Sequence, residues 1–328
     1  MELEKHQEEF AADVSIGLGA VNKHLNSRYF YDTEGDSLFQ AIMASPEYYL
    51  TDCEYEILER QGAQIAEAIA ATGPFELVEL GSGDGLKTSL LLDALHHIEA
   101  DFVYRPVDIS DNSLQLLADR LGQGRGWLKM DAIHGDYMQV LARARLSARQ
   151  RSGLQLSVPR KVLMFLGSNL GNYPGQKAVT FLQLVRHAMR VHDALLIGLD
   201  LQKDPAVINA AYNDAAGFTR DFNLNLLERI NRELGGNFDT GAFEHVPEYD
   251  PVTGMALSFL QSARPQTVYI DALDQRFQFA GGEKIFMEIS QKYSSQQIAD
   301  LVQTSGFKIG REYYDTRRYF TDQIWYPG

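Results

Sequence analysis

The sequence of 328 residues predicts an α/β fold: an open, mostly parallel sheet accompanied by a second, smaller α+β domain. Short apolar runs end in Gly, Asp or Asn and are followed by helical spacing, which is the α/β pattern. A glycine-rich turn follows the first of these runs. Beyond residue 236, alternating segments separated by Gly and Pro indicate antiparallel strands. At about 100–200 residues per domain, the length favours two domains.

Five apolar runs are predicted to form strands of the sheet. They cover residues 75–80, 102–107, 127–134, 161–166 and 194–200. The first leads into the turn 81–85 (GSGDG), after which apolar residues recur at helical spacing from Leu86 to Leu95. Each run delivers glycine or polar residues at its carboxyl end. Because ligands of open α/β sheets bind outside these ends, we expect a binding site there.

The remaining chain is predicted to form the smaller domain and then to return to the sheet. Residues 202–236 indicate helices, with Phe222, Leu226, Leu227 and Ile230 on one apolar stripe. Residues 237–292 indicate antiparallel strands. The tail predicts a helix over 294–306 and two strands that rejoin the first sheet as an antiparallel pair. The larger domain is therefore expected to comprise 53–201 with 293–328, and the smaller one 1–52 with 202–292.

Composition excludes several classes of partner. The chain has 30 Lys and Arg against 44 Asp and Glu, a net charge of -14, which repels nucleic acid and anionic lipid. The single cysteine, Cys53, cannot form an internal disulfide, and no Cys or His spacing predicts a metal site. No leader or membrane span is evident. We expect a cytoplasmic monomer acting on a small molecule, with no obligate protein partner.

The glycine-rich turn suits a ribose-containing ligand. Its spacing is G-x-G-x-G, and Leu86 occupies the position where a dinucleotide fingerprint requires its last glycine. Glycines let the turn approach a ligand closely. Glu79 precedes the turn and Asp108 ends the next strand, where a carboxylate can accept both ribose hydroxyls. Asp136 follows the third strand and is placed for an adenine.

This series of acidic residues and glycines resembles the class I S-adenosylmethionine-dependent methyltransferases, which have a Rossmann-like sheet. Their ligand carries ribose and adenine but no phosphate, and the chain has no P-loop Gly-Lys-Ser/Thr. A dinucleotide-dependent oxidoreductase is the alternative that Leu86 disfavours. The two differ in whether NADH or S-adenosylhomocysteine raises the melting temperature.

Along nearly its whole length, the sequence also resembles the histidine-specific Nα-methyltransferases of ergothioneine biosynthesis. The matching blocks are YFYD at 29–32, PEYYLT at 46–51, ELGSG at 79–83, FLGSNLGN at 165–172, AYND at 211–214, AFEHV at 242–246 and EISQKY at 288–293. The resemblance implies three methyl transfers from S-adenosylmethionine to the α-amino group of L-histidine. The products would be histidine betaine (hercynine) and S-adenosylhomocysteine, in the first step of ergothioneine biosynthesis.

The resemblance also implies two sets of site residues. The cofactor-binding set is Tyr48, Gly81, Ser82, Gly83, Lys87, Asp108, Asp136 and Tyr137, with Lys87 on the methionine carboxylate. The amino-acid pocket is Tyr31, Gly167, Asn172, Tyr212, Ser258, Glu288 and Ser290. Asn172 and Tyr212 are implied near the α-amino and carboxylate groups, as the candidate catalytic residues. Glu288 and Ser290 are implied at the imidazole.

Positioning is expected to dominate the chemistry, because a neutral amine must lie in line with the S–CH3 bond. Burial lowers the amine pKa, and no obligatory general base is assigned. Ser258 falls where we expect relatives to carry a bulky Met, so another aromatic substrate, such as tryptophan or tyrosine, is an alternative. A further alternative is a decayed, cofactor-binding scaffold that docks another protein. Intact candidate residues in both halves of the chain argue against it.

Overall fold

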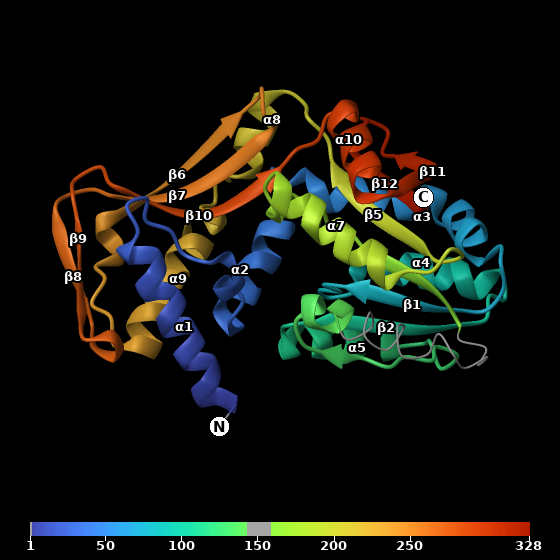
Figure 1. The fold of residues 1–328 in the computed structure, drawn as a ribbon, viewed down its shortest axis with the longest axis horizontal. Helices are drawn as coiled ribbons and strands as arrows, with labels where there is room; N and C mark the ends of the chain where they lie inside the picture. Colours follow the sequence, from blue (N-terminus) through green and yellow to red (C-terminus); the bar gives the residue numbers. More distant parts are fainter. Residues whose placement is uncertain (1, 143–158) are drawn as a thin grey trace. The chain divides into compact units, whose positions relative to one another are not determined.

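The computed structural model describes residues 2–142 and 159–328. The chain divides into two compact units, drawn in Figure 1. The first unit comprises Met1–Tyr48 and Lys203–Ser290, and the second comprises Tyr49–Gln202 and Gln291–Gly328. Each unit has its own hydrophobic core.

The second unit is built on a sheet ordered β11-β12-β5-β4-β1-β2-β3. Its strands are β1 (Phe75–Leu80), β2 (Phe102–Asp108), β3 (Ile133–His134), β4 (Arg160–Phe165), β5 (Ala194–Asp200), β11 (Phe307–Tyr314) and β12 (Phe320–Pro327). β1 lies parallel to β2 and β4, whereas β12 is antiparallel to β5 and β11. The strand order reverses at β1, which is the topological switch point of this class of sheet. The predicted α/β fold and the return of the tail are both confirmed.

The third predicted strand is much shorter than expected. Only Ile133 and His134 pair with β2, and Met130 adds one isolated bridge to Tyr104. The run lies at the edge of the sheet and is partly exposed. Its first residue, Trp127, stacks on His96 of a helix, with ring centroids 4.0 Å apart. An apolar run at an edge is free to pack elsewhere because no second neighbouring strand holds it.

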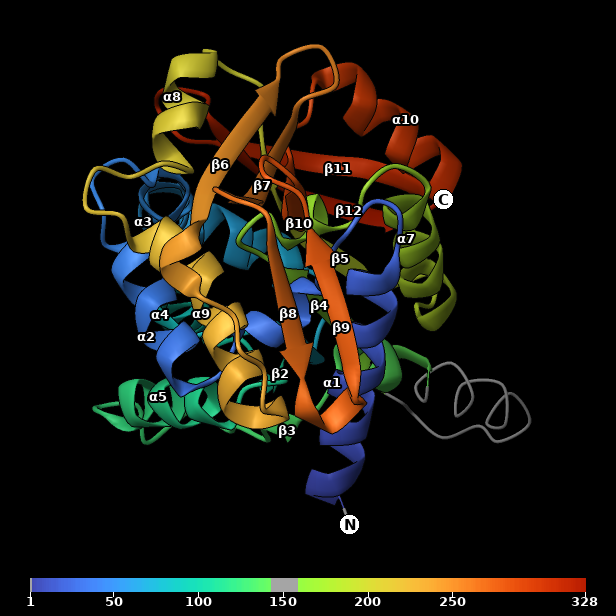
Figure 2. The same cartoon turned by 90° about the vertical axis from the view of Figure 1, so that its left-hand side faces the viewer.

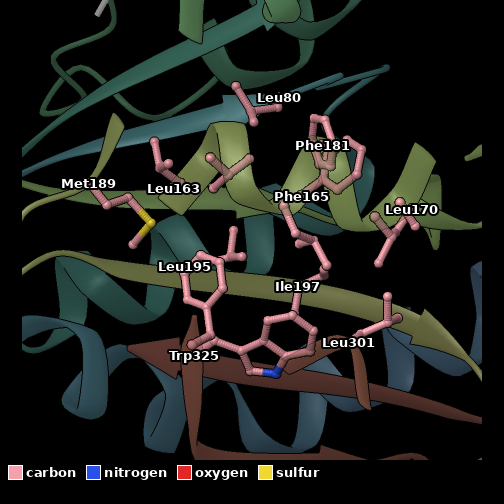
Figure 3. Close-up of a cluster of buried hydrophobic side chains, with 14 of the residues drawn as sticks. Leu80, Leu163, Phe165, Leu170, Phe181, Met189, Leu195, Ile197, Leu301 and Trp325 are labelled. Carbon is pink, nitrogen blue, oxygen red and sulfur yellow. The ribbon is translucent and has the colours of Figure 1, made fainter. Parts of the chain in front are cut away.

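Helices cover both faces of this sheet. They are α3 (Tyr49–Ala70), α4 (Leu86–His97), α5 (Asp111–Gly122), α7 (Gln176–Ala188) and α10 (Ser295–Ser305). α7 and α10 bury apolar side chains against one face, where Phe165, Phe181, Leu301 and Trp325 share a cluster (Figure 3). α10 begins with a capping box, in which Ser294 and Gln297 exchange side-chain and backbone hydrogen bonds.

The first unit combines helices with antiparallel strands, as predicted. Its helices are α1 (Glu2–Gly19), η1 (Ser27–Phe30), α2 (Thr33–Met43), α8 (Pro205–Ala211), α9 (Phe218–Leu234), η3 (Thr240–Ala242) and η4 (Asp271–Leu273). Its strands are β6 (Phe243–Asp250), β7 (Met255–Ser262), β8 (Gln266–Ile270), β9 (Gln275–Phe279) and β10 (Lys284–Gln291). One sheet has the order β10-β7-β6, and β8 and β9 form a separate hairpin. Figure 2 shows α9 beside β8 and α1 beside β9.

α9 is central to the core of the first unit. Its predicted apolar stripe is buried: Phe222 is 2 % exposed, and Leu226, Leu227 and Ile230 are 0 % exposed. This stripe packs in one cluster with residues of β7 and β10, such as Leu260 and Met287. The helix also carries polar contacts to the segment before α2, since Asn225 Nδ2 donates to Asp32 at 2.8 Å. The helix therefore joins the amino-terminal helices to the sheet within this unit.

Candidate functional site

The glycine-rich turn at the end of β1 is close to residues from two other loops. The Gly81 N–H donates to the Val107 carbonyl at 2.7 Å, and its φ of +74° lies in the left-handed region. A Cβ added at Gly81 would lie 3.4 Å from Asn169 Nδ2 and 4.0 Å from Tyr137 Cε1. Gly81 and Tyr137, both predicted site residues, therefore meet at the switch point. Asn169 joins them but was not predicted.

Asp108 is held rigidly at the end of β2. Asp108 is 9 % exposed, and its carboxylate accepts hydrogen bonds from the Gly83 N–H and the Ser110 N–H, each at 3.0 Å. A carboxylate can accept about four hydrogen bonds, so two amides fix its plane without exhausting its capacity. Ser82 lies between the two glycines of the turn. Its buried Oγ has no hydrogen-bond partner among the described residues.

Lys87 and Gly167 come together through a buried carboxylate. Lys87 Nζ lies 3.6 Å from the position that a Cβ on Gly167 would take. Glu54 of α3 is 0 % exposed, forms an ion pair with Lys87, and accepts the Gly167 N–H at 2.8 Å. Glu54 was missed by the sequence analysis. The available signal was a charged residue on the apolar stripe of a helix that includes Leu50 and Ile57.

Asp136 follows β3 as predicted, and its backbone is tied to the end of β2. The preceding Gly135 donates its N–H to the Asp108 carbonyl at 2.8 Å. Asp136 Oδ1 accepts the Met138 N–H at 2.7 Å, which fixes the orientation of the half-buried carboxylate. The carboxyl ends of β2 and β3 thus present two acidic side chains, Asp108 and Asp136.

The other predicted residues of the second unit are Tyr137 and Asn172. Tyr137 shares a hydrogen bond with Tyr173, with 2.8 Å between their hydroxyl oxygens, and lies edge-on to Phe165. Asn172 ends the short helix η2 (Asn169–Asn172), and its side chain is exposed. Most of the predicted residues of this unit thus lie at the carboxyl ends of β1, β2, β3 and β4: Gly81, Gly83, Lys87, Asp108, Asp136, Tyr137 and Gly167. Asn172 lies beyond Gly167, at the end of η2.

Glu79, which precedes the turn, ties β1 to α4 and β2. It is 2 % exposed and accepts hydrogen bonds from the hydroxyls of Thr88, at 2.7 Å, and Tyr104. Burial raises the pKa of Glu79 from 4.5 to about 7, although these hydrogen bonds oppose the shift. The folded state therefore binds this proton more tightly than the unfolded state does. The resulting stabilisation is full below pH 4.5 and is lost as the pH rises through about 7.

Glu79→Gln is expected to remove this pH dependence. Between about pH 5 and pH 8, the wild-type free energy of unfolding should fall by up to about 3 kcal/mol relative to the variant. Urea denaturation of both proteins across this range measures the difference. An effect of the amide on hydrogen bonding that does not depend on pH shifts the whole profile of the variant, so it does not alter the difference in pH dependence between the two proteins. Parallel pH profiles of the two proteins would show that Glu79 does not titrate in this window.

In the first unit, the three predicted tyrosines belong to one chain of aromatic rings. Tyr31 lies edge-on to Phe39 and Phe222, each with ring centroids 5.8 Å apart. Phe39 continues to Tyr48 at 6.5 Å, and Tyr48 to Tyr212 at 6.4 Å. Phe39 and Phe222 were not predicted as site residues, because aromatic side chains at helical spacing are indistinguishable from core residues in a sequence. The edge-on geometry is the one that aromatic pairs favour.

Strand parity separates Ser258 from Glu288 and Ser290. The ring of Phe286 packs on Phe259 at 5.8 Å, so Phe259 and the even-numbered positions of β10 share one face of the sheet. Glu288 and Ser290 lie on that face. Ser258 is adjacent to Phe259 in β7 and therefore lies on the opposite face.

The predicted pocket residues Ser258 and Glu288 therefore cannot both point to the same face of this sheet. Ser258 is 1 % exposed, and its Oγ has no hydrogen-bond partner within the described ranges. Counting along the sequence does not determine the face of a strand residue, because a shift of one residue exchanges the two faces. The residues of β7 that share the face of Glu288 are Met255, Leu257, Phe259 and Gln261.

None of the described helices combines the length and the hydropathy needed to cross a bilayer. Within residues 2–142 and 159–328, no three His, Cys, Asp or Glu side chains are grouped so that they could hold a metal ion.

The sheet order, with its antiparallel final strand, and the acidic and glycine-rich ends of its first strands define a class I methyltransferase fold. The profile of the family described as "Histidine-specific methyltransferase, SAM-dependent" matches residues 10–327. The chain belongs to this family, and it is an S-adenosylmethionine-dependent methyltransferase.

Individual relatives agree with this assignment. The chain is 36 % identical over 296 residues to the histidine N-alpha-methyltransferase of Mycolicibacterium smegmatis, covering 90 % of this chain and 88 % of that protein. Its identity to the enzyme of the same name from Mycobacterium tuberculosis is 37 % over 295 residues, covering 90 % and 87 %. A more distant relative is the L-tryptophan methyltransferase of Psilocybe serbica, at 26 % identity over 90 % of this chain and 86 % of that protein.

The residues at the switch point fit S-adenosylmethionine. Among the described residues, the buried hydroxyl of Ser82 has no hydrogen-bond partner, and Gly81 has a left-handed φ that favours glycine. Asp108 is an oriented anionic acceptor for a diol, and the Lys87 ammonium is a cation for a carboxylate. A ligand with ribose hydroxyls at one end and an amino-acid carboxylate at the other matches this set of groups.

Proposed function

We propose that the protein trimethylates the α-amino group of L-histidine to give histidine betaine, as the first step of ergothioneine biosynthesis. The observation that carries the proposal is the match of nearly the whole chain to a histidine-specific family. When bound, S-adenosylmethionine supplies the electrophilic methyl group. The residues of this chain would hold the amine lone pair in line with that methyl group, and the methylated amine would release a proton to water before each further transfer.

On this proposal, the second unit holds the cofactor at the carboxyl ends of its parallel strands. Asp108 accepts the ribose hydroxyls, Asp136 accepts from the adenine amino group, and Lys87 neutralises the methionine carboxylate. Gly81, Ser82, Gly83 and Tyr137 form the wall against which the ligand lies. Tyr48 is proposed as a further cofactor contact. The rigid backbone bonds to Asp108 support its role, because an acceptor that is already oriented loses little entropy on binding.

The amino acid is proposed to be recognised at both of its ends. Tyr31 and Tyr212 lie in one aromatic chain, which supports a shared role in holding the substrate. Tyr212 and Asn172 orient the α-amine, and Gly167 contributes backbone to the same group. Glu288 accepts a hydrogen bond from one imidazole nitrogen, and Ser290 binds the other. Their positions two residues apart on one face of β10 support this pairing.

The residues proposed around the amine act by position rather than by proton transfer. A protonated α-amine has no lone pair for attack, so the site must favour the neutral form. Burial lowers the amine pKa, and acceptors such as Asn172 Oδ1 direct the lone pair. Each methylation removes one N–H donor, so acceptors that tolerate the loss are needed for three transfers. Neutral Asn and Tyr side chains meet that requirement better than a buried carboxylate does.

Incubation with S-adenosylmethionine and an equimolar mixture of the standard amino acids is the direct test. Mass spectrometry of the products should show histidine alone, carrying three added methyl groups. Methylated tryptophan or tyrosine would instead favour the alternative of a related α-N-methyltransferase. If no amino acid is methylated while S-adenosylhomocysteine still raises the melting temperature, the substrate assignment falls and cofactor binding stands.

A further inference from the structure

We propose that Glu54 and Asp322 are a pair of positioning residues that share one proton and hold Lys87 and the Gly167 amide in place. The inference rests on the proposed function, which assigns the methionine carboxylate to Lys87. Neither acid belongs to the predicted cofactor-binding set, and neither reaches the surface, since both are 0 % exposed. Their role would be to set the position and charge of Lys87.

Glu54 connects two segments that otherwise come from different parts of the sheet. Lys87 lies in the first turn of α4, directly after the glycine-rich turn of β1. Gly167 lies in the loop after β4. The Glu54 carboxylate forms an ion pair with Lys87 Nζ and accepts the Gly167 N–H, with Oε1 at 2.8 Å and Oε2 at 3.0 Å. One side chain therefore fixes both groups on either side of the switch point.

Asp322 lies beside Glu54 above the backbone of β5. It is paired with Gly198 in the register of β12 and β5. A Cβ added at Gly198 would lie 3.1 Å from Asp322 Oδ1 and would overlap Glu54 Oε1. The two carboxyl groups therefore occupy neighbouring space that exists only because residue 198 is a glycine. No N–H or hydroxyl of the described residues donates to either oxygen of Asp322.

Charge balance indicates that one of the two acids is protonated. Lys87 is the cation that interacts with both of them. Glu79 is a third buried acid near Lys87 and adds negative charge whenever it is ionised, so ionisation of both Glu54 and Asp322 would leave an uncompensated buried charge. Burial raises the pKa of Asp322 well above its usual range, the charge of Glu54 raises it further, and Lys87 opposes the shift. Asp322 is thus the neutral acid, and its proton is the donor to Glu54.

This arrangement affects the affinity for a ligand that carries a carboxylate. With Asp322 neutral, the charges of Glu54 and Lys87 cancel, and the ammonium is held in place. A second ionised carboxylate would make the cluster net negative and would repel the carboxylate of a ligand. The affinity for a ligand without a carboxylate would not change. The ratio of affinities for S-adenosylhomocysteine and 5′-methylthioadenosine, which lacks the amino-acid portion, therefore reports on the pair.

Titration calorimetry of the full chain with both nucleosides is the test. Lys87→Met is the benchmark that should lower this affinity ratio. Glu54→Ala is expected to weaken S-adenosylhomocysteine by about 10- to 100-fold and 5′-methylthioadenosine by less than about threefold. Glu54→Gln should be milder, because its amide still accepts the Gly167 N–H. Glu59→Ala, on the exposed side of the same helix, is the matched control and should leave the ratio unchanged.

Asp322→Asn distinguishes a neutral acid from an ionised one. Asparagine retains a donor toward Glu54 without charge, so both affinities should stay within about threefold of wild type. The infrared difference between wild type and this variant should contain the C=O band of one protonated carboxyl group. A missing band, or damage as severe as that of Glu54→Ala, would overturn the shared proton.

If Glu54→Ala does not fold, Gly198→Ala tests the positioning role of Glu54 instead. Its Cβ displaces the Glu54 carboxylate without removing a charge, so S-adenosylhomocysteine should bind about tenfold more weakly while 5′-methylthioadenosine is retained. An unchanged ratio in this variant overturns the positioning role. If the wild type binds neither nucleoside, the proposed function fails before the pair is tested.

Discussion

Asp108→Asn is expected to weaken S-adenosylhomocysteine binding by about 100-fold, because charge-assisted hydrogen bonds contribute about 1.5–3 kcal/mol each. The substitution removes the charge proposed to hold the ribose hydroxyls. It also places an amide NH2 against either the Gly83 or the Ser110 N–H, both of which are donors. The side chain at position 108 would then lose one of the two hydrogen bonds that orient it. Titration calorimetry measures the affinity directly.

Asp84→Asn is the matched control for this substitution. Asp84 lies in the same turn, accepts the Leu86 N–H and forms an ion pair with Arg120 at 2.9 Å. Its replacement removes the same charge from the same loop, so it reports any effect of the local field. We expect less than about a threefold change in affinity, because a partly exposed ion pair contributes little. Equal losses in the two variants would mean that Asp108 acts through general electrostatics rather than through contact.

Glu288→Ala is expected to reduce the preference for histidine over tryptophan by about 10- to 100-fold, mainly through a lower kcat/KM for histidine. The carboxylate is proposed to accept an imidazole N–H, and loss of a charged acceptor costs about 1.5–3 kcal/mol. Tryptophan, which lacks the second ring nitrogen that Ser290 would bind, should be little affected. Competition between the two amino acids, followed by mass spectrometry, gives the ratio directly.

Two further variants define what the Glu288 result means. Glu244→Ala removes an exposed carboxylate from the same sheet and should leave the preference unchanged. Ser258→Ala should also leave it unchanged, because Ser258 lies on the opposite face of β7 from Phe259. Unaltered selectivity in Glu288→Ala would refute its proposed contact with the imidazole. A change in Ser258→Ala alone would point to recognition on the other face.

Local patterns in the sequence were sufficient to predict the frame of the cofactor site. The strand ends at Leu80 and Asp108, the turn between Gly81 and Gly85, and the helix after it were all readable from hydrophobic period and glycine spacing. These features depend on residues close together in the chain. The return of the tail to the sheet was predicted from two aromatic, strand-like segments after a helical segment.

Tertiary structure decided the features that depend on which face or which distant partner a side chain meets. The face on which Ser258 lies could be assigned only from the register of its strand, because strand parity and not sequence distance determines the face. The contacts of Glu54 could not be predicted from the sequence, because its partners Gly167 and Asp322 are distant in the chain and adjoin Glu54 only in the fold. The sequence by itself therefore determined the class of sheet and its ligand-facing ends. The buried contacts that orient Lys87 arose only from packing, because burial and charge pairing are properties of the assembled core.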